Sequence, residues 1–153
     1  MELDTTKTIL LPICGKEVDE SAFLVAAWLA KTSKSLVRAL HVIEVSRDMP
    51  LDADLSEEAA LGERILGKIE DRAKAEKCPM QAEIIQARSA GHAIVQEAQI
   101  RNAQTIVLGT SRIREITGEY FGRTISYILK NTDCEVIIWR GRTYGQGLTE
   151  RVY

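Results

Sequence analysis

The sequence predicts an α/β protein: an open, mostly parallel sheet of five strands in the order 3-2-1-4-5, with helices on both faces. Short apolar runs alternate along the chain with longer stretches of helical periodicity, the pattern of strand–helix–strand units. We expect one domain over residues 1–153, with a core at about 8–140 and a tail at 141–153. In such sheets, ligands bind beyond the carboxyl ends of the strands, where the strand order reverses.

The first three elements follow from apolar patterning. Residues 8–14 form a continuous apolar run typical of a strand buried on both faces. Pro12 lacks an N–H and is therefore expected near the carboxyl end of this strand. Residues 19–32 predict a helix, because apolar side chains cover a wide face of it. Residues 35–45 predict the second strand, which a polar loop follows.

A long helix is expected next, over residues 54–76. Asp54 and Glu57 resemble a capping box at its start, and apolar residues recur at every fourth position along it. Pro79 ends this region, because proline cannot continue a helix. The alternation of residues 80–86 then predicts the third strand.

The second half of the chain repeats the alternation. Its apolar periodicity predicts a helix over 91–101 and another over 122–131. Buried strands are expected over 105–109 and 135–140, and a loop rich in Arg and Thr covers residues 110–118. The strands at 8–14 and 105–109 are expected to flank the point where the strand order reverses.

Charge and composition exclude several classes of protein. Twenty Lys and Arg against 22 Asp and Glu give a net charge of −2, whereas a nucleic-acid binder is usually strongly basic. The longest apolar run, residues 22–30, is much shorter than the roughly 20 residues of a membrane-spanning helix. Residues 1–4 are acidic where a signal peptide is basic, so we expect a cytoplasmic protein.

Cysteines and histidines offer no metal site by spacing. Cys14, Cys78 and Cys134 contain no CxxC pair and are expected to be small buried hydrophobes. Cys14 lies at the end of a strand, and the alternative for this residue is a reactive thiol. His41 lies in an apolar strand and is expected to be a core histidine with a satisfied ring. His92 is expected at a helix start, capping or exposed.

Five blocks of sequence resemble the universal stress protein family. They are Thr-Ile-Val-Leu-Gly-Thr-Ser-Arg at 105–112, Phe-Gly-Arg-Thr-Ile-Ser continuing to Ile-Ile-Trp at 121–139, Ile-Leu-Leu-Pro-Ile-Cys-Gly at 9–15, Asp-Glu-Ser at 19–21 and Leu-His-Val-Ile at 40–43. The resemblance covers nearly the whole chain. It implies an adenine nucleotide alpha hydrolase-like domain, usually homodimeric, with a non-catalytic or weakly catalytic regulatory role in stress physiology.

Many members of that family bind ATP through a Gly-x2-Gly-x9-Gly-Ser/Thr pattern after the fourth strand. Glycines let backbone N–H groups approach phosphate oxygens, and a helix N-terminus completes the anion site. The resemblance places Gly109 and Gly122 at the first and third glycines. Arg112 replaces the second glycine, and Arg123 replaces the hydroxyl residue, with Thr124 following it.

The residues on the adenine side of the implied site also match those of the binding members only in part. Binding members usually carry an Asp at the end of the first strand, where this chain has Cys14. Pro12 and Val42 match positions that line the adenine and ribose pocket, and Leu108 precedes the first glycine. The candidate nucleotide contacts are therefore Pro12, Cys14, Val42, Leu108, Gly109, Arg112, Gly122, Arg123 and Thr124.

Two functional interpretations of the changed loop are open, beside a simpler structural one. In one, the arginines fill the crevice and binding of adenine nucleotide is weakened or lost. In the other, Arg112, Arg114 and Arg123 surround a helix N-terminus and attract ATP, ADP, AMP or another anionic metabolite. A third, simpler interpretation is a solvated surface loop whose arginines pair with Glu115 and Glu119.

We expect a regulatory homodimer rather than an enzyme. The family commonly pairs through the fifth strand, and an open apolar edge strand is an aggregation hazard, so we expect pairing through Val136, Ile137, Ile138 and Trp139. A ligand sensor and the regulatory partner of a transporter are the alternatives. No Walker A, G-x-G-x-x-G or G-x-S-x-G motif occurs.

Polar residues elsewhere have structural explanations. Asp133 and Glu119 are the acids nearest the implied phosphate site in sequence, and neither lies at a recognised catalytic position. Lys16 stands among Glu17, Asp19 and Glu20, which indicate an acid-rich helix start. Ser89 is expected to be a helix N-cap rather than a nucleophile.

Overall fold

The computed structural model describes residues 7–110 and 122–142 and shows a five-stranded sheet in the order β3-β2-β1-β4-β5. Every neighbouring pair of strands is parallel. The strands are β1 (Thr8–Pro12), β2 (Leu36–Glu44), β3 (Met80–Ala87), β4 (Ala103–Thr110) and β5 (Glu135–Arg140). The helices are α1 (Val18–Ser33), α2 (Ser56–Ala75), α3 (Ala90–Ile100) and α4 (Gly122–Asn131). The predicted fold class and strand order are confirmed.

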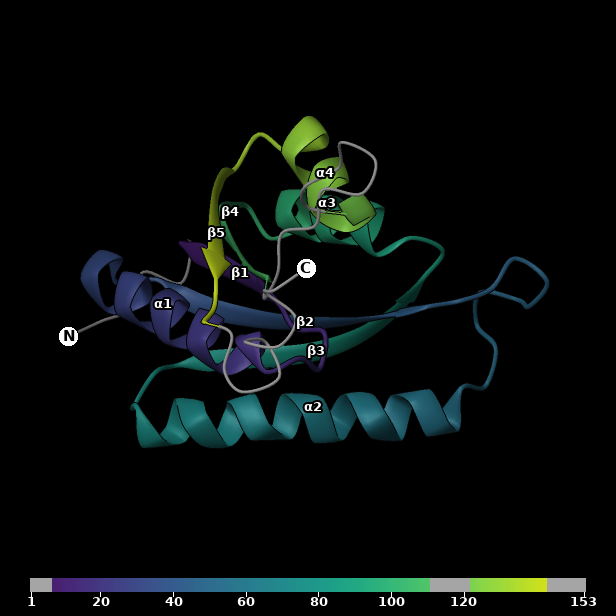
Figure 1. Cartoon of the computed structure of the whole chain (residues 1–153), viewed down its shortest axis with the longest axis horizontal. Helices are drawn as coiled ribbons and strands as arrows, with labels where there is room; N and C mark the ends of the chain where they lie inside the picture. The colour runs from purple at the N-terminus through teal and green to yellow at the C-terminus, as the bar shows by residue number, and fades with distance from the viewer. Residues whose placement is uncertain (1–6, 111–121, 143–153) are drawn as a thin grey trace, which may run out of the picture.

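The helices form a layer on each face of the sheet, with α1 and α2 on one face and α3 and α4 on the other (Figure 1). Alternate residues of each central strand enter opposite layers: Leu11 packs beneath α1 and α2, and Leu10 packs beneath α3 and α4. Because both faces are covered, β1 is apolar along its whole length, as a strand buried on both sides must be.

The first strand ends earlier than the sequence predicts. β1 ends at Pro12, although the apolar run reaches residue 14, and one more ladder bond joins the N–H of Ile13 to the carbonyl of Leu40. Beyond it, the backbone N–H groups of Cys14 and Gly15 donate to the carboxylate of Asp19 instead of to a neighbouring strand. The expectation of a strand over 8–14 was therefore too long, because a side chain competes for the amides.

Capping was predicted less well than the helices themselves. The α2 helix begins at Ser56, and its N-cap residue, Leu55, makes no side-chain capping bond, so the capping box at Asp54 and Glu57 is wrong. Burial of apolar residues along one face stabilises this helix without it. Ser89 is at the N-cap position of α3 but makes no capping bond. The carboxylate of Glu44, at the end of β2, accepts the N–H of Ala90 instead.

None of the three cysteines is buried, which corrects the expectation of small core residues. Cys14 is exposed, and Cys78 and Cys134 are half-buried. The physical reason is their location, since each lies in a connection beside a strand rather than within one. Among the described residues, no helix is long and apolar enough to cross a membrane, and no three His, Cys, Asp or Glu side chains are grouped as metal ligands.

Candidate functional site

The candidate site lies at the carboxyl ends of the strands, where β1 stands between β2 and β4. Strand order reverses at β1, because the chain adds β2 and β3 on one side and β4 and β5 on the other. Leu108 and Val42 pack with the layer of α3 and α4. Pro12 follows Leu10 by two positions and therefore points to the same face. The structure thus brings Pro12, Val42 and Leu108 to one face of the sheet.

Gly109 has a packing explanation in this structure. A Cβ atom at this position would lie 3.0 Å from Cβ of Ala22 and 3.2 Å from Cγ1 of Val18, both on α1. That side of β4 faces away from Pro12 and Leu108. The absence of a side chain at Gly109 therefore lets α1 approach the sheet closely, whatever the residue does for a ligand.

Gly122 begins α4 with a positive φ of 74°, a conformation that L side chains rarely adopt. Among the described residues, no atom would lie within 4 Å of a Cβ there, so the backbone conformation is the reason the structure gives for glycine. Arg123 is exposed, Thr124 is half-buried, and no acidic residue lies in the first turn of the helix. Arg112, Arg114, Glu115 and Glu119, which the sequence placed around this helix start, lie outside the described residues.

Asp19 organises the turn after β1. Its side chain is 6% exposed, and one carboxylate oxygen lies 2.6 Å from the amide nitrogen of Gly15 and 3.0 Å from that of Lys16. The other oxygen lies 3.3 Å from the amide nitrogen and 3.6 Å from Sγ of Cys14. The sequence predicted only an acid-rich helix start here. The structure instead shows a carboxylate that accepts hydrogen bonds from three backbone N–H groups after the end of β1.

The thiol of Cys14 is held in its protonated form. Partial burial raises the pKa of Cys14 above its ordinary value of 9.0, and the negative charge of Asp19 raises it further. Lys16 opposes this change and lowers the pKa, but its effect is smaller. Cys14 therefore lacks the electropositive surroundings of a reactive cysteine.

The two histidines occupy opposite sides of the sheet. Nδ1 of His41 lies 2.8 Å from the carbonyl oxygen of Ile13, which confirms a satisfied histidine, and its ring packs close to Gly62 of α2. His92 is exposed, in the first turn of α3, and its Nδ1 lies 3.2 Å from the hydroxyl of Tyr127 on α4. Tyr127 also packs on Gly91, so it joins the two helices beside the site.

Sequence reasoning missed two of these residues. Asp19 carries a signal that could have identified it: an acid five residues after a strand end, where a turn exposes several consecutive N–H groups. Tyr127 carries no such signal. Its contact with His92 spans 35 positions and depends on how α3 and α4 pack together.

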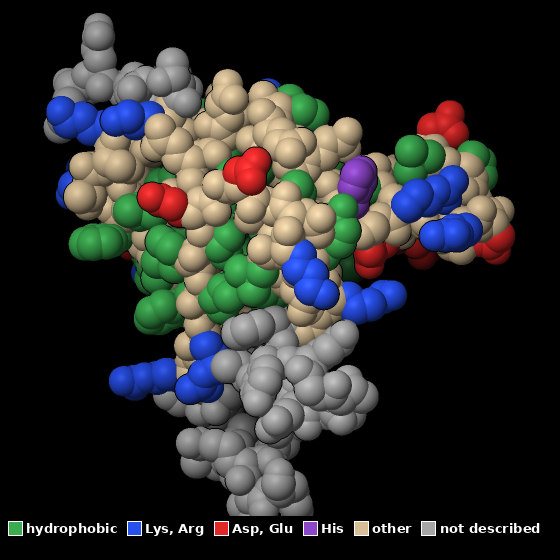
Figure 2. All heavy atoms as spheres, turned by 90° about the horizontal axis from the view of Figure 1, so that it is seen from above, with side chains coloured by type: hydrophobic (Ala, Val, Ile, Leu, Met, Phe, Trp, Pro, Cys, Tyr) green, Lys and Arg blue, Asp and Glu red, His purple; other side chains and the backbone are tan. Residues whose placement is uncertain are grey.

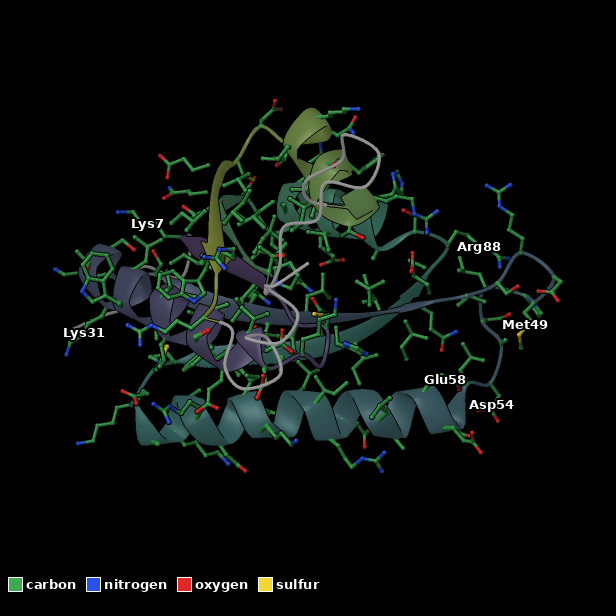
Figure 3. The ribbon with its side chains drawn as sticks, in the orientation of Figure 1. Lys7, Lys31, Met49, Asp54, Glu58 and Arg88 are labelled. Carbon is green, nitrogen blue, oxygen red and sulfur yellow. The ribbon has the colours of Figure 1, made fainter. Side chains whose placement is uncertain are left out.

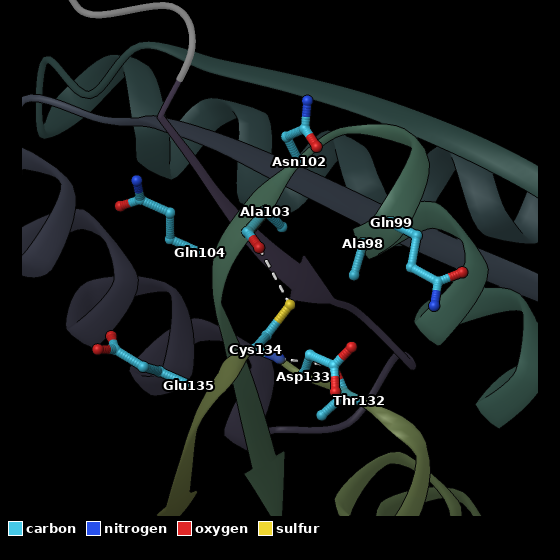
Figure 4. Close-up of a pocket in the computed structure, with 9 residues that line it drawn as sticks. All are labelled: Ala98, Gln99, Asn102, Ala103, Gln104, Thr132, Asp133, Cys134 and Glu135. Carbon is cyan, nitrogen blue, oxygen red and sulfur yellow. Dashed lines mark hydrogen bonds between the residues drawn. The ribbon is translucent and has the colours of Figure 1, made fainter.

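The pocket of about 400 Å³ shown in Figure 4 lies at the opposite edge of the sheet, near the amino ends of β4 and β5. Sγ of Cys134 donates to the carbonyl of Ala103 within it. Its lining comprises Ala98, Gln99, Asn102, Ala103, Gln104, Thr132, Asp133, Cys134 and Glu135. None of the predicted nucleotide contacts that the structure describes lines this pocket, which lies at the other end of the strands from them.

A parallel sheet whose strand order reverses at its central strand, with helices on both faces, defines the class of doubly wound α/β proteins. The sequence model of the Universal stress protein family matches residues 5–140. The chain belongs to the universal stress protein family.

Known relatives agree with this assignment. A universal stress protein of Methanocaldococcus jannaschii is 27% identical over 138 residues, which cover 86% of this chain and 81% of the relative. A universal stress protein solved in complex with cAMP has a TM-score of 0.71 at 18% identity, and the match covers 88% of this chain and 96% of that one. The universal stress protein of Archaeoglobus fulgidus, solved in complex with dAMP, has a TM-score of 0.70 at 16% identity, with 86% and 96% covered.

Proposed function

We propose that this protein is a non-enzymatic, cytosolic regulator of stress physiology whose binding of adenine nucleotide is weakened. The turn after β1 carries the proposal. Its backbone N–H groups and the thiol of Cys14 are engaged by the carboxylate of Asp19, so they are not available to a ligand. Three free cysteines are consistent with a reducing compartment.

Adenine nucleotides are the ligand class to test, because two solved universal stress proteins are complexes with cAMP and dAMP. Pro12, Val42 and Leu108 share a face, as a site for an adenine ring and ribose requires. Gly109 is accounted for by the packing of α1, which leaves Gly122 as the glycine of the pattern that no atom of the described residues crowds.

A second candidate function is a ligand sensor that uses Arg123. This arginine is exposed in the first turn of α4, directly after the positive-φ Gly122, and that turn contains no acid. A guanidinium at a helix start adds a charged donor to the backbone N–H groups of the first turn, which suits a phosphate. On this account, Arg123 substitutes for the missing glycine and hydroxyl contacts.

Calorimetric titration with ATP, ADP and AMP separates the two candidates. The proposal predicts no measurable heat, or binding too weak to saturate. Micromolar binding that weakens about tenfold in Arg123→Glu supports the sensor instead. Lys130→Glu is the matched control, because Lys130 is also exposed on α4 but lies in its last turn. Micromolar binding that neither substitution changes contradicts both accounts.

We also propose a homodimer paired through the outer edge of β5, which no described strand occupies. The N–H of Gly141 donates to the carbonyl of Thr110 on β4. Because backbone groups alternate along a strand, the N–H and C=O groups of Val136, Ile138 and Arg140 point to the open edge. Antiparallel pairing of two β5 strands about Ile138 places Val136 opposite Arg140 of the second copy and satisfies these groups.

Arg140→Pro tests the pairing directly. Proline removes an N–H that points away from β4, so the bonds within the sheet are kept and the intermolecular bond is lost. We expect sedimentation equilibrium to show weaker association than for Arg140→Ala, which keeps the N–H. Equal association of the two variants, with both folded, contradicts pairing through this edge.

A further inference from the structure

The cleft at the amino ends of β4 and β5 is formed where two connections of the chain meet. One connection joins α3 to β4 and includes Asn102, and the other joins α4 to β5 and includes Thr132, Asp133 and Cys134. The volume of about 400 Å³ is within the range of sites that hold small molecules. The cleft lies at the opposite end of the strands from the proposed nucleotide site and has a different lining.

We propose that this cleft binds a small organic amine, whose ammonium group contacts the carboxylate of Asp133 and the side-chain amides of Gln99 and Asn102. The site is additional to the function proposed above. Its negative lining repels phosphate, so its ligand is distinct from an adenine nucleotide.

The lining offers hydrogen-bond acceptors and negative charge. Asp133 and Glu135 supply carboxylates, and Gln99, Asn102 and Gln104 supply amides, whereas no Lys, Arg or His side chain lines the cleft. Within the described part of the chain, the carboxylate of Asp133 makes no hydrogen bond or ion pair. An ammonium group carries the opposite charge and donates three hydrogen bonds, which matches such a lining.

The end of α3 also favours a cation from outside the chain. A helix C-terminus carries partial negative charge and is stabilised by a nearby cation. The α1, α2 and α4 helices each have a basic side chain in the last turn, but α3 has none. Arg101, directly after α3, forms ion pairs with Glu83 and Glu97 instead.

The backbone repeats one conformation where three helices lead into strands. Lys34 after α1, Lys77 after α2 and Asn102 after α3 have positive φ angles of 55°, 53° and 52°. Glycine is the usual residue in this conformation after a helix. The first two positions carry an ammonium group, and the third carries an amide that lines the cleft. A bound amine would bring to the end of α3 the charge that lysine brings to the other two.

Figure 4 shows how the side chains of the cleft are arranged. Sγ of Cys134 lies 3.0 Å from the carbonyl oxygen of Ala103, so the thiol is part of the lining. Oε2 of Glu135 accepts a hydrogen bond from Thr105, which leaves Asp133 as the principal carboxylate for a ligand. Figure 2, which views the molecule from above, shows two acidic side chains on the side where β5 lies, with no Lys or Arg side chain between them on that face.

Cys134 provides the test, because it is half-buried in the cleft and a bound ligand would cover it. The full chain is alkylated with iodoacetamide at neutral pH and constant ionic strength, with 1,4-diaminobutane as the probe. Peptide mass spectrometry then gives the rate at each cysteine. We expect the rate at Cys134 to fall about fivefold at saturation, and the rate at Cys78, in the connection before β3, to stay constant. The neutral analogue 1,4-butanediol should give no protection.

Two variants test the assigned contacts. Asp133→Asn keeps the shape of the side chain but removes its charge, and should raise the half-protecting concentration of 1,4-diaminobutane about tenfold. Asn102→Gly keeps the positive φ and removes the amide, and should raise that concentration about threefold. Asp71→Asn is the matched control, since Asp71 is exposed on α2, and should change nothing.

Three results would overturn the inference: no protection of Cys134 by the diamine, equal protection by the diol, or equal effects of Asp133→Asn and Asp71→Asn. None of them bears on the proposed weakening of nucleotide binding, because that proposal concerns the other end of the strands and is tested with ATP, ADP and AMP.

Discussion

Asp19 is the residue on which the turn after β1 depends. Its buried carboxylate accepts hydrogen bonds from the N–H groups of three consecutive residues, and its removal takes away the partner of all three. Asp19→Ala should therefore lower the free energy of unfolding by about 1–3 kcal/mol, measured by urea denaturation. Glu20→Ala is the control: Glu20 is exposed and pairs with Arg72 on the surface, so its loss should cost well under that.

The same carboxylate controls the chemistry of Cys14. Burial and the charge of Asp19 both raise the pKa of the thiol, so less thiolate is present at a given pH than for a free cysteine. Asp19→Asn removes the second cause and should lower the pKa. Alkylation of Cys14 by iodoacetamide, followed by peptide mass spectrometry across a pH series, should then reach half its maximal rate at lower pH. An unchanged profile would show that Asp19 does not act on the thiol.

The free energy of unfolding should depend on pH through the thiols of Cys14 and Cys78. The pKa values of Cys14 and Cys78 are both raised above 9.0, so the unfolded chain loses these protons at lower pH than the folded protein does. The stabilisation is therefore complete below pH 9.0 and is lost as the pH rises through the folded values. Cys14→Ser with Cys78→Ser should flatten the fall in urea midpoint above pH 9.0. A fall as steep as in the wild type contradicts this explanation.

At the scale of elements, α1 packs closely on β4 beside the site. Gly109→Ala places a methyl group 3.0 Å from Cβ of Ala22 and should destabilise the protein by about 1–3 kcal/mol. Gly67→Ala is the matched control, since none of the described atoms lies within 4 Å of a Cβ there and alanine favours the α2 helix by about 0.5–1 kcal/mol. Equal effects of the two substitutions on thermal unfolding would contradict the packing account of Gly109.

The loop between β2 and α2 is fastened to the end of β3. Arg88 donates to the carbonyls of Ser46 and Met49, and Gln86 donates to those of Leu51 and Ala53. These hydrogen bonds hold the loop in place at the projecting end of the molecule (Figure 3). Arg88→Ala should speed tryptic cleavage after Arg47 by about tenfold through local opening. Arg64→Ala, on the exposed face of α2, should leave the rate unchanged. An equal rate in both variants would show that Arg88 does not hold the loop.

Elements could be predicted from the sequence wherever one periodicity dominated. The α4 and β5 boundaries agree with the prediction because amphipathic spacing at 122–131 and an apolar run at 135–140 leave no alternative. The end of β1 and the start of α2 could not be placed. The first depends on Asp19 competing for backbone amides, and the second on a helix without a side-chain cap. Such local competition has no periodic signature.

For the whole molecule, strand order and the location of the site follow from topology, because right-handed crossovers and buried parallel strands permit few arrangements. Topology does not predict whether the polar groups of the candidate site face a ligand or the backbone. The change from Asp to Cys14 suggested loss of an acid, yet Asp19 brings a carboxylate back to the same turn from five residues along the chain. Side-chain geometry decides whether that acid faces a ligand or the backbone, and here it faces the backbone.

Native mass spectrometry of the purified protein tests the central claim most directly, because one spectrum reports both the assembly and any nucleotide that it carries. The account predicts a dimer of the 17.0 kDa chain without bound adenine nucleotide, and little retention when ATP or AMP is added. A chain that retains a stoichiometric nucleotide through purification would contradict weakened binding. A monomer at the concentrations where the edge of β5 should pair would contradict the proposed assembly.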